Sequence, residues 1–283
     1  VINKADASIM VNGYTGTYDG LPHGATGTAY GVGGVDLSSG LNLGVTFTNA
    51  PGGSAHWTFS GGTNYKDQSG DAAIVINKAT LTVTAVDMGK LLNASNPTFT
   101  FQINGFKFGE TASILITQPI CTSTAETNSP VGSYAIICTG ATADNYSFNY
   151  IVGKLSITYR FDGFLQPIND TAHTQLCGPV CPISIFKGGS TIPVKFQLKD
   201  ANGVVVQTSL APLWLSPVLG GQTTAPVDET TYFDLPTNGA TYSWDGQQYH
   251  YNWSTKGFKA GYYYRIGFKL TDGTTNYVYI GLR

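Results

Sequence analysis

The feature that most constrains the fold of this 283-residue chain is a pentapeptide that occurs twice. Val-Ile-Asn-Lys-Ala stands at residues 1–5 and again at residues 75–79. An identical segment that returns unchanged indicates repeated modules. A strand-like segment at residues 153–158 closes the second module before the composition changes. We therefore predict domains at residues 1–77, 78–158 and 159–283, and we expect the parent protein to carry an earlier repeat.

Composition predicts β-structure throughout the chain. It holds 35 glycines, 17 tyrosines and 14 phenylalanines, while charged residues make up only 11%. Such a chain favours short strands separated by tight turns over helices with a solvated face. Turn signals recur at the spacing typical of a β-sandwich. We expect an all-β fold, in which only residues 210–219 suggest a helix, and Pro212 and Pro217 argue against that helix.

The third predicted domain differs chemically from the other two. It holds 20 of the 35 aromatic residues, which are 14 Phe, 17 Tyr and 4 Trp. Its strands alternate regularly: Ile192, Val194 and Phe196 are apolar, whereas Lys195 between them is charged. Because successive strand residues point to opposite faces, one face of such a strand packs and the other is solvated. Residues 262–270 show the same pattern.

Charge and motif content exclude several function classes. A formal net charge of −2 gives no electrostatic reason to expect nucleic acid or an anionic membrane as partner. No apolar run approaches the ~20 residues of a membrane-spanning helix. The chain lacks His-Glu-x-x-His, Gly-x-Ser-x-Gly and the phosphate-binding loop motif, and its four histidines are dispersed. We predict a non-enzymatic protein with no cofactor, no metal and no catalytic residue.

The four cysteines form two pairs in the sequence, Cys121 with Cys138 and Cys177 with Cys181. Paired cysteines in a β-rich chain favour an oxidising compartment, and hence an extracellular or cell-surface location. A Cys121–Cys138 bridge would stabilise its domain by ~3 kcal/mol in the chain-entropy model. Cys177 and Cys181, with His173 nearby, could form part of a metal site, but a fourth ligand is lacking and we favour a disulfide.

Five other polar residues, in three groups, have structural interpretations. Asp19 and His23 flank a turn, where we expect them to fix the backbone geometry and not to bind a ligand. Lys195 could form an isopeptide bond, but we expect it to face solvent because burying an unpaired lysine is costly. Asp228 and Glu229 are expected to be a solvated pair and not an acid/base couple.

The first module resembles the bacterial immunoglobulin-like repeats called MBG or YDG domains, through residues 13–27, with the run Tyr18-Asp19-Gly20, and through residues 33–37. The second module resembles them too, although the usual Tyr-Gly after the first strand is replaced around Met88-Gly89. The motifs that carry this second resemblance are Asn96-Pro97-Thr98-Phe99, Gly105-Phe106, Gly109-Glu110-Thr111, Pro130-Val131-Gly132-Ser133-Tyr134 and Asn145-Tyr146-Ser147-Phe148.

The third segment resembles the PxKF domain, named for a motif seen here as Pro193-Val194-Lys195-Phe196. Together the resemblances imply three tandem immunoglobulin-like β-sandwich domains in a secreted or surface-attached bacterial protein. Such repeats serve as spacers, adhesive modules or filament subunits, and the families supply no catalytic residues. We expect self-association, either head to tail or by strand exchange, with residues 1–12 as donor strand and residues 276–283 as acceptor edge.

A second hypothesis is a carbohydrate- or matrix-binding module that recognises surface glycans through its aromatic residues. Tyr249, Tyr251 and Trp253 alternate and could form a flat stacking platform. The same alternation is typical of one face of a hydrophobic core, and we favour the core.

Overall fold

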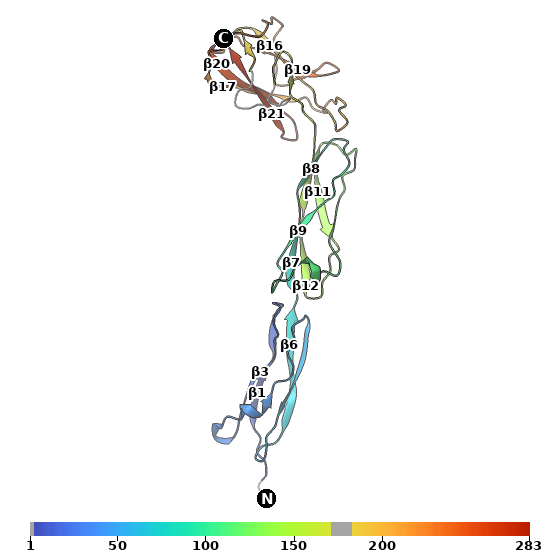
Figure 1. Cartoon of the computed structure of the whole chain (residues 1–283), viewed down its shortest axis with the longest axis vertical. Helices are drawn as coiled ribbons and strands as arrows, with labels where there is room; N and C mark the ends of the chain where they lie inside the picture. The colour runs from blue at the N-terminus through green and yellow to red at the C-terminus, as the bar shows by residue number, and fades with distance from the viewer. Residues whose placement is uncertain (1–2, 171–182) are drawn as a thin grey trace. The chain divides into compact units, whose positions relative to one another are not determined.

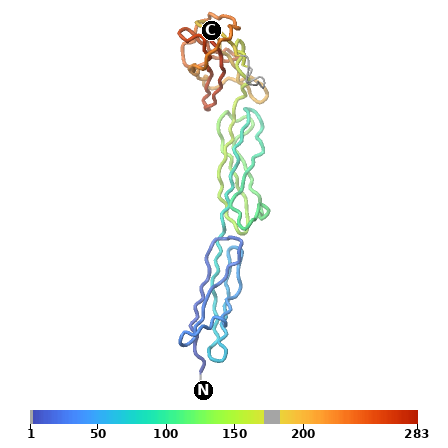
Figure 2. The backbone as a smooth tube through the Cα atoms, turned by 60° about the vertical axis from the view of Figure 1, so that its left-hand side comes forward, coloured from blue at the N-terminus to red at the C-terminus, as the bar shows by residue number. Residues whose placement is uncertain are grey.

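The structure is a computed structural model that describes residues 3–170 and 183–283. Described residues outside loops and turns form β-strands, apart from three short 3-10 segments, Val32–Gly34, Ser38–Gly40 and Ala112–Ile114. The predicted all-β fold class is confirmed. Figure 1 labels many of the strands, and Figure 2 follows the backbone between them.

By its internal contacts the chain divides into two compact units. The first unit comprises Val1–Met88, Thr98–Thr124 and Ala135–Lys154, and the second comprises Gly89–Pro97, Ala125–Tyr134 and Leu155–Arg283. All five points at which the chain passes from one unit to the other fall inside the predicted second domain. The three predicted domains therefore stay a sequence-based prediction, and we keep the terms first module (residues 1–77) and second module (residues 78–158) for their segments.

In the first module, a four-stranded sheet lies beside a two-stranded one. The four-stranded sheet has the order β2-β6-β5-β4, with β2 Tyr14–Thr17, β4 Leu41–Asn42, β5 Gly52–Phe59 and β6 Gln68–Asn77. The other sheet pairs β1 (Ser8–Asn12) antiparallel with β3 (Thr26–Tyr30). Alternation places Ala72, Ile74 and Ile76 of β6 in the core, with their neighbours exposed.

The second module begins almost without a linker. Strand β7 (Ala79–Ala85) starts one residue after β6 ends, so Lys78 alone separates them. β7 is the central strand of the sheet β12-β7-β9, in which β12 is Tyr146–Ile151 and β9 is Phe101–Asn104. A further sheet has the order β10-β11-β13-β8, from Ile120–Ser123, Gly132–Thr139, Gly153–Thr158 and Met88–Leu91 respectively.

Residues 159–283, within the second unit, form two four-stranded sheets. One has the order β14-β16-β19-β18, from Phe164–Leu165, Thr191–Phe196, Tyr249–Ser254 and Ser243–Trp244. The other has the order β15-β21-β20-β17, from Ile185–Phe186, Thr275–Leu282, Tyr262–Lys269 and Leu213–Gln222. Their shared core is aromatic, and the rings of Phe196 and Phe268, one from each sheet, stack at 3.8 Å.

The alternation predicted for the third segment holds only in part in β16, because Thr191 and Pro193 on the other face are buried as well. Ile192, Val194 and Phe196 are fully buried, while Lys195 between them is partly exposed. The helix considered for residues 210–219 is wrong, because Leu213–Gln222 forms strand β17. This strand lies at the end of its sheet, where a proline can be accommodated because no neighbour needs its missing N–H.

Candidate functional site

The described residues hold no arrangement suited to metal binding. Within residues 3–170 and 183–283, no cluster of three or more His, Cys, Asp or Glu side chains could hold a metal ion. In the same part of the chain, no helix has the length and apolar character that crossing a membrane would need.

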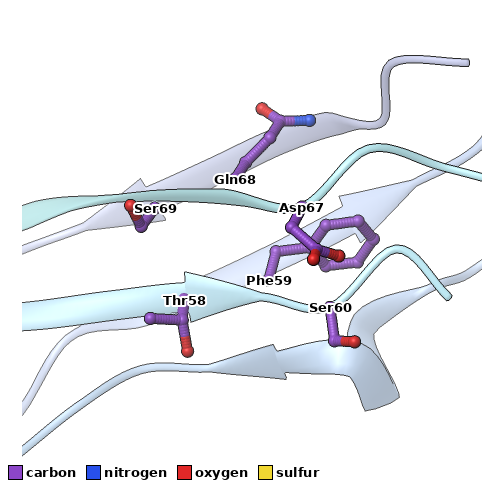
Figure 3. A pocket seen from close by; sticks show the side chains of 6 residues that line it. All are labelled: Thr58, Phe59, Ser60, Asp67, Gln68 and Ser69. Carbon is purple, nitrogen blue, oxygen red and sulfur yellow. The ribbon is translucent and has the colours of Figure 1, made fainter.

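A hollow of about 430 Å³ lies beside the end of β5 and the start of β6. Figure 3 shows its lining: Thr58 and Phe59 of β5 with Ser60 after it, and Gln68 and Ser69 of β6 with Asp67 before it. The Asp67 carboxylate accepts from the Gly61 N–H at 2.8 Å, and the Gln68 side chain donates to the Ala7 carbonyl at 3.0 Å. Both side chains thus fix the chain locally.

The aromatic residues considered as a glycan-stacking platform lie in the core. Tyr249, Tyr251 and Trp253 are only 1%, 7% and 4% exposed. The ring of Trp214 stacks on Tyr251 at 4.3 Å, and that of Phe196 stacks on Tyr249 at 5.1 Å. Because other aromatic rings already cover these faces, the platform hypothesis is wrong at these positions, and the core interpretation describes them.

The structure contains a disulfide between Cys121 and Cys138, the pairing that the sequence suggests. The two residues stand directly opposite each other in the antiparallel pair β10 and β11, with their Cα atoms 3.9 Å apart. Cys177 and Cys181 lie outside the described residues, so their pairing stays a prediction.

The strands expected to exchange between subunits both have neighbours within the chain. The donor segment, residues 1–12, includes β1, which is paired with β3 over its whole length. The acceptor segment, residues 276–283, belongs to β21, which lies between β15 and β20 and is not the outermost strand of its sheet. The expected open acceptor edge is therefore wrong for residues 281–282, which pair with β15.

Within the first unit, one hydrophobic cluster extends from the first module into the second. Ile74 and Ile76 of β6 share one buried cluster with Ala79 and Leu81 of β7, and the cluster also contains Tyr18 and Tyr146. Since the cluster continues from one strand into the next across Lys78, the two modules do not have separate cores at this point.

Two tyrosines from different modules meet on one carboxylate. The Tyr18 hydroxyl donates to Glu110 Oε1 at 2.7 Å, and the Tyr146 hydroxyl donates to Glu110 Oε2. The rings of Tyr18 and Tyr146 pack edge to face with centroids 5.4 Å apart. We call Tyr18, Glu110 and Tyr146 the tyrosine clamp. Hydrogen bonds to a charged acceptor are stronger than neutral ones, and loss of Glu110 would remove the acceptor to which both buried hydroxyls donate.

Burial keeps both clamp tyrosines in their donor form. Tyr18 and Tyr146 are 4% and 2% exposed. Desolvation, followed by the hydrogen bond to Glu110, raises the pKa of Tyr18, and the same causes raise the pKa of Tyr146 to about 12. At neutral pH each hydroxyl therefore carries the proton that it donates to the carboxylate.

The turn after Tyr18 is fixed by its own side chains. The Asp19 carboxylate accepts from the Leu21 N–H at 2.9 Å and contacts His23 Nε2 at 2.9 Å. These two partners, the backbone N–H first, hold the pKa of Asp19 below its usual value. The His23 ring stacks on Tyr14 at 4.0 Å. Asp19 and His23 thus fix the turn locally, as expected. This turn carries Tyr18 and Gly20, which contact the second module.

Two further contacts complete the junction. Gly20 has a φ of +86°, and a Cβ at this position would lie 2.4 Å from the Cβ of Phe108. Asn145 Nδ2 donates to Asn49 Oδ1, and Asn145 Oδ1 accepts from the Ala50 N–H, both at 2.9 Å. A glycine is therefore needed at residue 20 for two reasons, its backbone conformation and the close approach of Phe108.

In the second unit, the turn at Leu92 corresponds to the turn at Tyr18 in the first unit. Tyr18 N–H donates to the carbonyl of Asn77 at the end of β6, and Leu92 N–H donates to that of Thr158 at the end of β13. The carbonyl of Leu92 accepts from the Ala201 N–H, and Asn93 Nδ2 donates to Asp200 Oδ2, both at 2.9 Å. Each of these two turns thus contacts the part of the chain that follows its module: the Tyr18 turn contacts the second module, and the Leu92 turn contacts Asp200 and Ala201.

Sequence reasoning found the residues of the clamp but not their role. Tyr18, Glu110 and Tyr146 all lie in the motifs that carry the resemblance to MBG repeats. The available signal was a carboxylate and two tyrosines in segments otherwise occupied by turn residues. Glu110 is 92 residues from Tyr18 and 36 residues from Tyr146 in the sequence, so no local pattern could pair them.

Comparisons with solved structures give only remote similarities. The Escherichia coli adhesin FdeC is 12% identical over 99% of this chain and 98% of its own, with a TM-score of 0.26. Immunoglobulin domains 1–5 of Sidekick-1 are 11% identical over 99% of this chain and 59% of theirs, with a TM-score of 0.24. A 1.5-MDa bacterial ice-binding adhesin is 10% identical over 99% and 100%, with a TM-score of 0.21. At these values we transfer no function from them.

Comparison with known sequences is more specific but covers less of the chain. No curated protein matches the sequence. Residues 81–156 match the MBG domain of the YGX type. The match lies inside the second module and includes Glu110 and Tyr146 but not Tyr18. It does not extend to a first MBG repeat or to a PxKF domain, which stay predictions. Residues 81–156 are thus assigned to the MBG domain family, as the resemblance of the second module predicts.

Proposed function

We propose that the chain is a structural spacer of a bacterial surface protein, in which tandem β domains hold an adhesive part away from the cell. The tyrosine clamp is the observation that carries this proposal. A spacer must resist bending between its domains, and a one-residue linker with a buried, hydrogen-bonded junction limits bending. The MBG assignment of residues 81–156 and the disulfide support an extracellular location.

Filament formation by strand exchange is the less favoured form of the same proposal. It would require β1 to leave β3, with which it forms a complete two-stranded sheet. A carbohydrate-binding function loses its structural basis, because its candidate residues are buried. A spacer needs neither an exchangeable strand nor an exposed aromatic surface. Electron microscopy of the purified chain separates the two forms, since ordered filaments would favour exchange and single particles the spacer.

The stiffness of the junction can be measured directly. Spin labels at Met10→Cys and Ile151→Cys, both on exposed positions of the first unit, report the distance between the two modules by double electron–electron resonance. We expect a narrow distance distribution in this chain and a broad one after Glu110→Ala, because that change removes the shared acceptor. Glu126→Ala, an exposed glutamate, is the matched control and should leave the distribution narrow. A broad distribution before any change at Glu110 would refute a stiff spacer.

A further inference from the structure

The surface that receives Tyr18 on the second module has a structural counterpart on the first. In the second module, Lys78 Nζ donates to the Ala143 carbonyl at 3.1 Å, and in the first, Lys4 Nζ donates to the Gly62 carbonyl at 2.7 Å. Likewise Ala79 N–H donates to the carbonyl of Asn145, and Ala5 N–H to that of Asn64. Ala79 pairs parallel with Tyr146, and Ala5 pairs parallel with Tyr65. Tyr65 therefore stands where Tyr146 stands.

The loop that carries Glu110 is matched as well. Lys107 N–H donates to the Tyr146 hydroxyl at 2.8 Å, and Val32 N–H donates to the Tyr65 hydroxyl at 3.1 Å. Each donor is followed by two residues with positive φ, Phe108 and Gly109 in one loop, Gly33 and Gly34 in the other. The next residue is Glu110 in the first of these loops and Val35 in the second, so Val35 occupies the place of Glu110.

The two surfaces differ in what covers them. In the second module Tyr146 is 2% exposed, because Tyr18 and its turn pack against it. In the first module Val32 and Val35 are 71% and 57% exposed, and Tyr65 is only partly buried. Val35 also replaces a charged acceptor by an apolar side chain. The counterpart surface is thus uncovered, and it carries Val35 in the place of the charged acceptor.

We propose that this surface, formed by residues 31–36 and 62–65, docks a further domain of the MBG type joined through a Val-Ile-Asn-Lys-Ala junction. The occupant presents a turn equivalent to residues 18–20, and its aromatic ring packs on Val35. A second copy of this chain could supply such a turn only by giving up contacts of its own, since its Tyr18 turn contacts Glu110 and its Leu92 turn contacts Ala201. The matching anchors of Lys4 and Lys78 indicate a covalent junction of the same geometry.

A duplicated chain tests the proposal. Because residues 1–5 and 75–79 are identical, placing a copy of residues 1–74 ahead of the full chain reproduces the native junction. Val35→Cys is introduced in the downstream copy only, and its reaction with a water-soluble maleimide is compared between the duplicated and the original chain. We expect labelling to slow by at least about tenfold in the duplicated chain, since docking must open before the thiol reacts.

Two controls make the outcome decisive. Val45→Cys in the same copy is 61% exposed in the original chain and lies outside the docking surface, so it should react equally fast in both chains. Labelling is measured on protein that resists limited proteolysis over its whole length, so that the added copy is known to be folded. Equal labelling of Val35→Cys in both chains would overturn the proposal. The stiffness of the Tyr18 junction is a separate measurement, so a failure of the spacer function would be recognised independently.

Discussion

At the scale of single residues, the clamp should make the first unit sensitive to high pH. A tyrosine in the unfolded chain ionises near pH 10, whereas folding raises the pKa of Tyr18 and takes that of Tyr146 to about 12. The stabilisation is therefore complete below pH 10 and is lost as the pH rises from about 10 to about 12. Hydrogen exchange of first-unit peptides across this range should show falling protection.

The matched variants separate the clamp from general alkaline effects. Tyr18→Phe combined with Tyr146→Phe should lower protection at neutral pH and flatten its loss above pH 10, because the ionising groups are gone. Tyr30→Phe, at a tyrosine that is 46% exposed, should leave the pH profile unchanged. An unaltered profile in the double variant would show that other groups cause the alkaline loss.

Gly20 tests whether the junction requires close contact. Gly20→Ala should destabilise the first unit by more than Gly33→Ala, since both have positive φ but only residue 20 would place its Cβ against a neighbour, Phe108. The backbone conformation alone costs roughly 1–2 kcal/mol for a non-glycine residue, and a clash adds to that cost. Denaturant unfolding compares the two variants. Similar losses for both would mean that Phe108 moves aside freely.

At the scale of elements, alternation in the sequence located one buried face of each of three strands of the third segment, β16, β19 and β20. In β19 every second residue is buried, whereas in β16 and β20 the buried apolar alternates are joined by Pro193 and Gly267 from the other face. The same alternation could not decide whether Tyr249, Tyr251 and Trp253 face a core or a ligand, because both are covered apolar surfaces. Only the second sheet of the second unit, whose Phe268 and Tyr264 pack in the same core, settles which face they form.

Trp253 should therefore be needed for folding. Its ring packs against Phe258 and Tyr264, with centroids at 5.0 and 6.0 Å. Trp253→Ala should cost the second unit about 3–5 kcal/mol, whereas Phe233→Ala, at a side chain that is 85% exposed, should change stability by less than about 0.5 kcal/mol. Denaturation followed by far-ultraviolet circular dichroism measures both. A stably folded Trp253→Ala protein would contradict the core assignment.

At the scale of the whole molecule, two compact units should unfold as two cooperative transitions. Glu110 lies in the first unit and Trp253 in the second. In differential scanning calorimetry, Glu110→Ala should lower the midpoint of one transition, and Trp253→Ala should lower that of the other. A single transition shifted by both variants would mean that the units unfold together.

The sequence by itself determined the β class, the alternating faces of several strands and the pairing of Cys121 with Cys138. These properties follow from local composition and from a period of two residues along a strand. Tertiary structure alone decided that Tyr18 reaches Glu110 and Tyr146, that the aromatic alternates of β19 face inward, and that β1 already has a partner in β3. These are contacts between segments distant in sequence, and their formation depends on which surfaces the packed chain brings together.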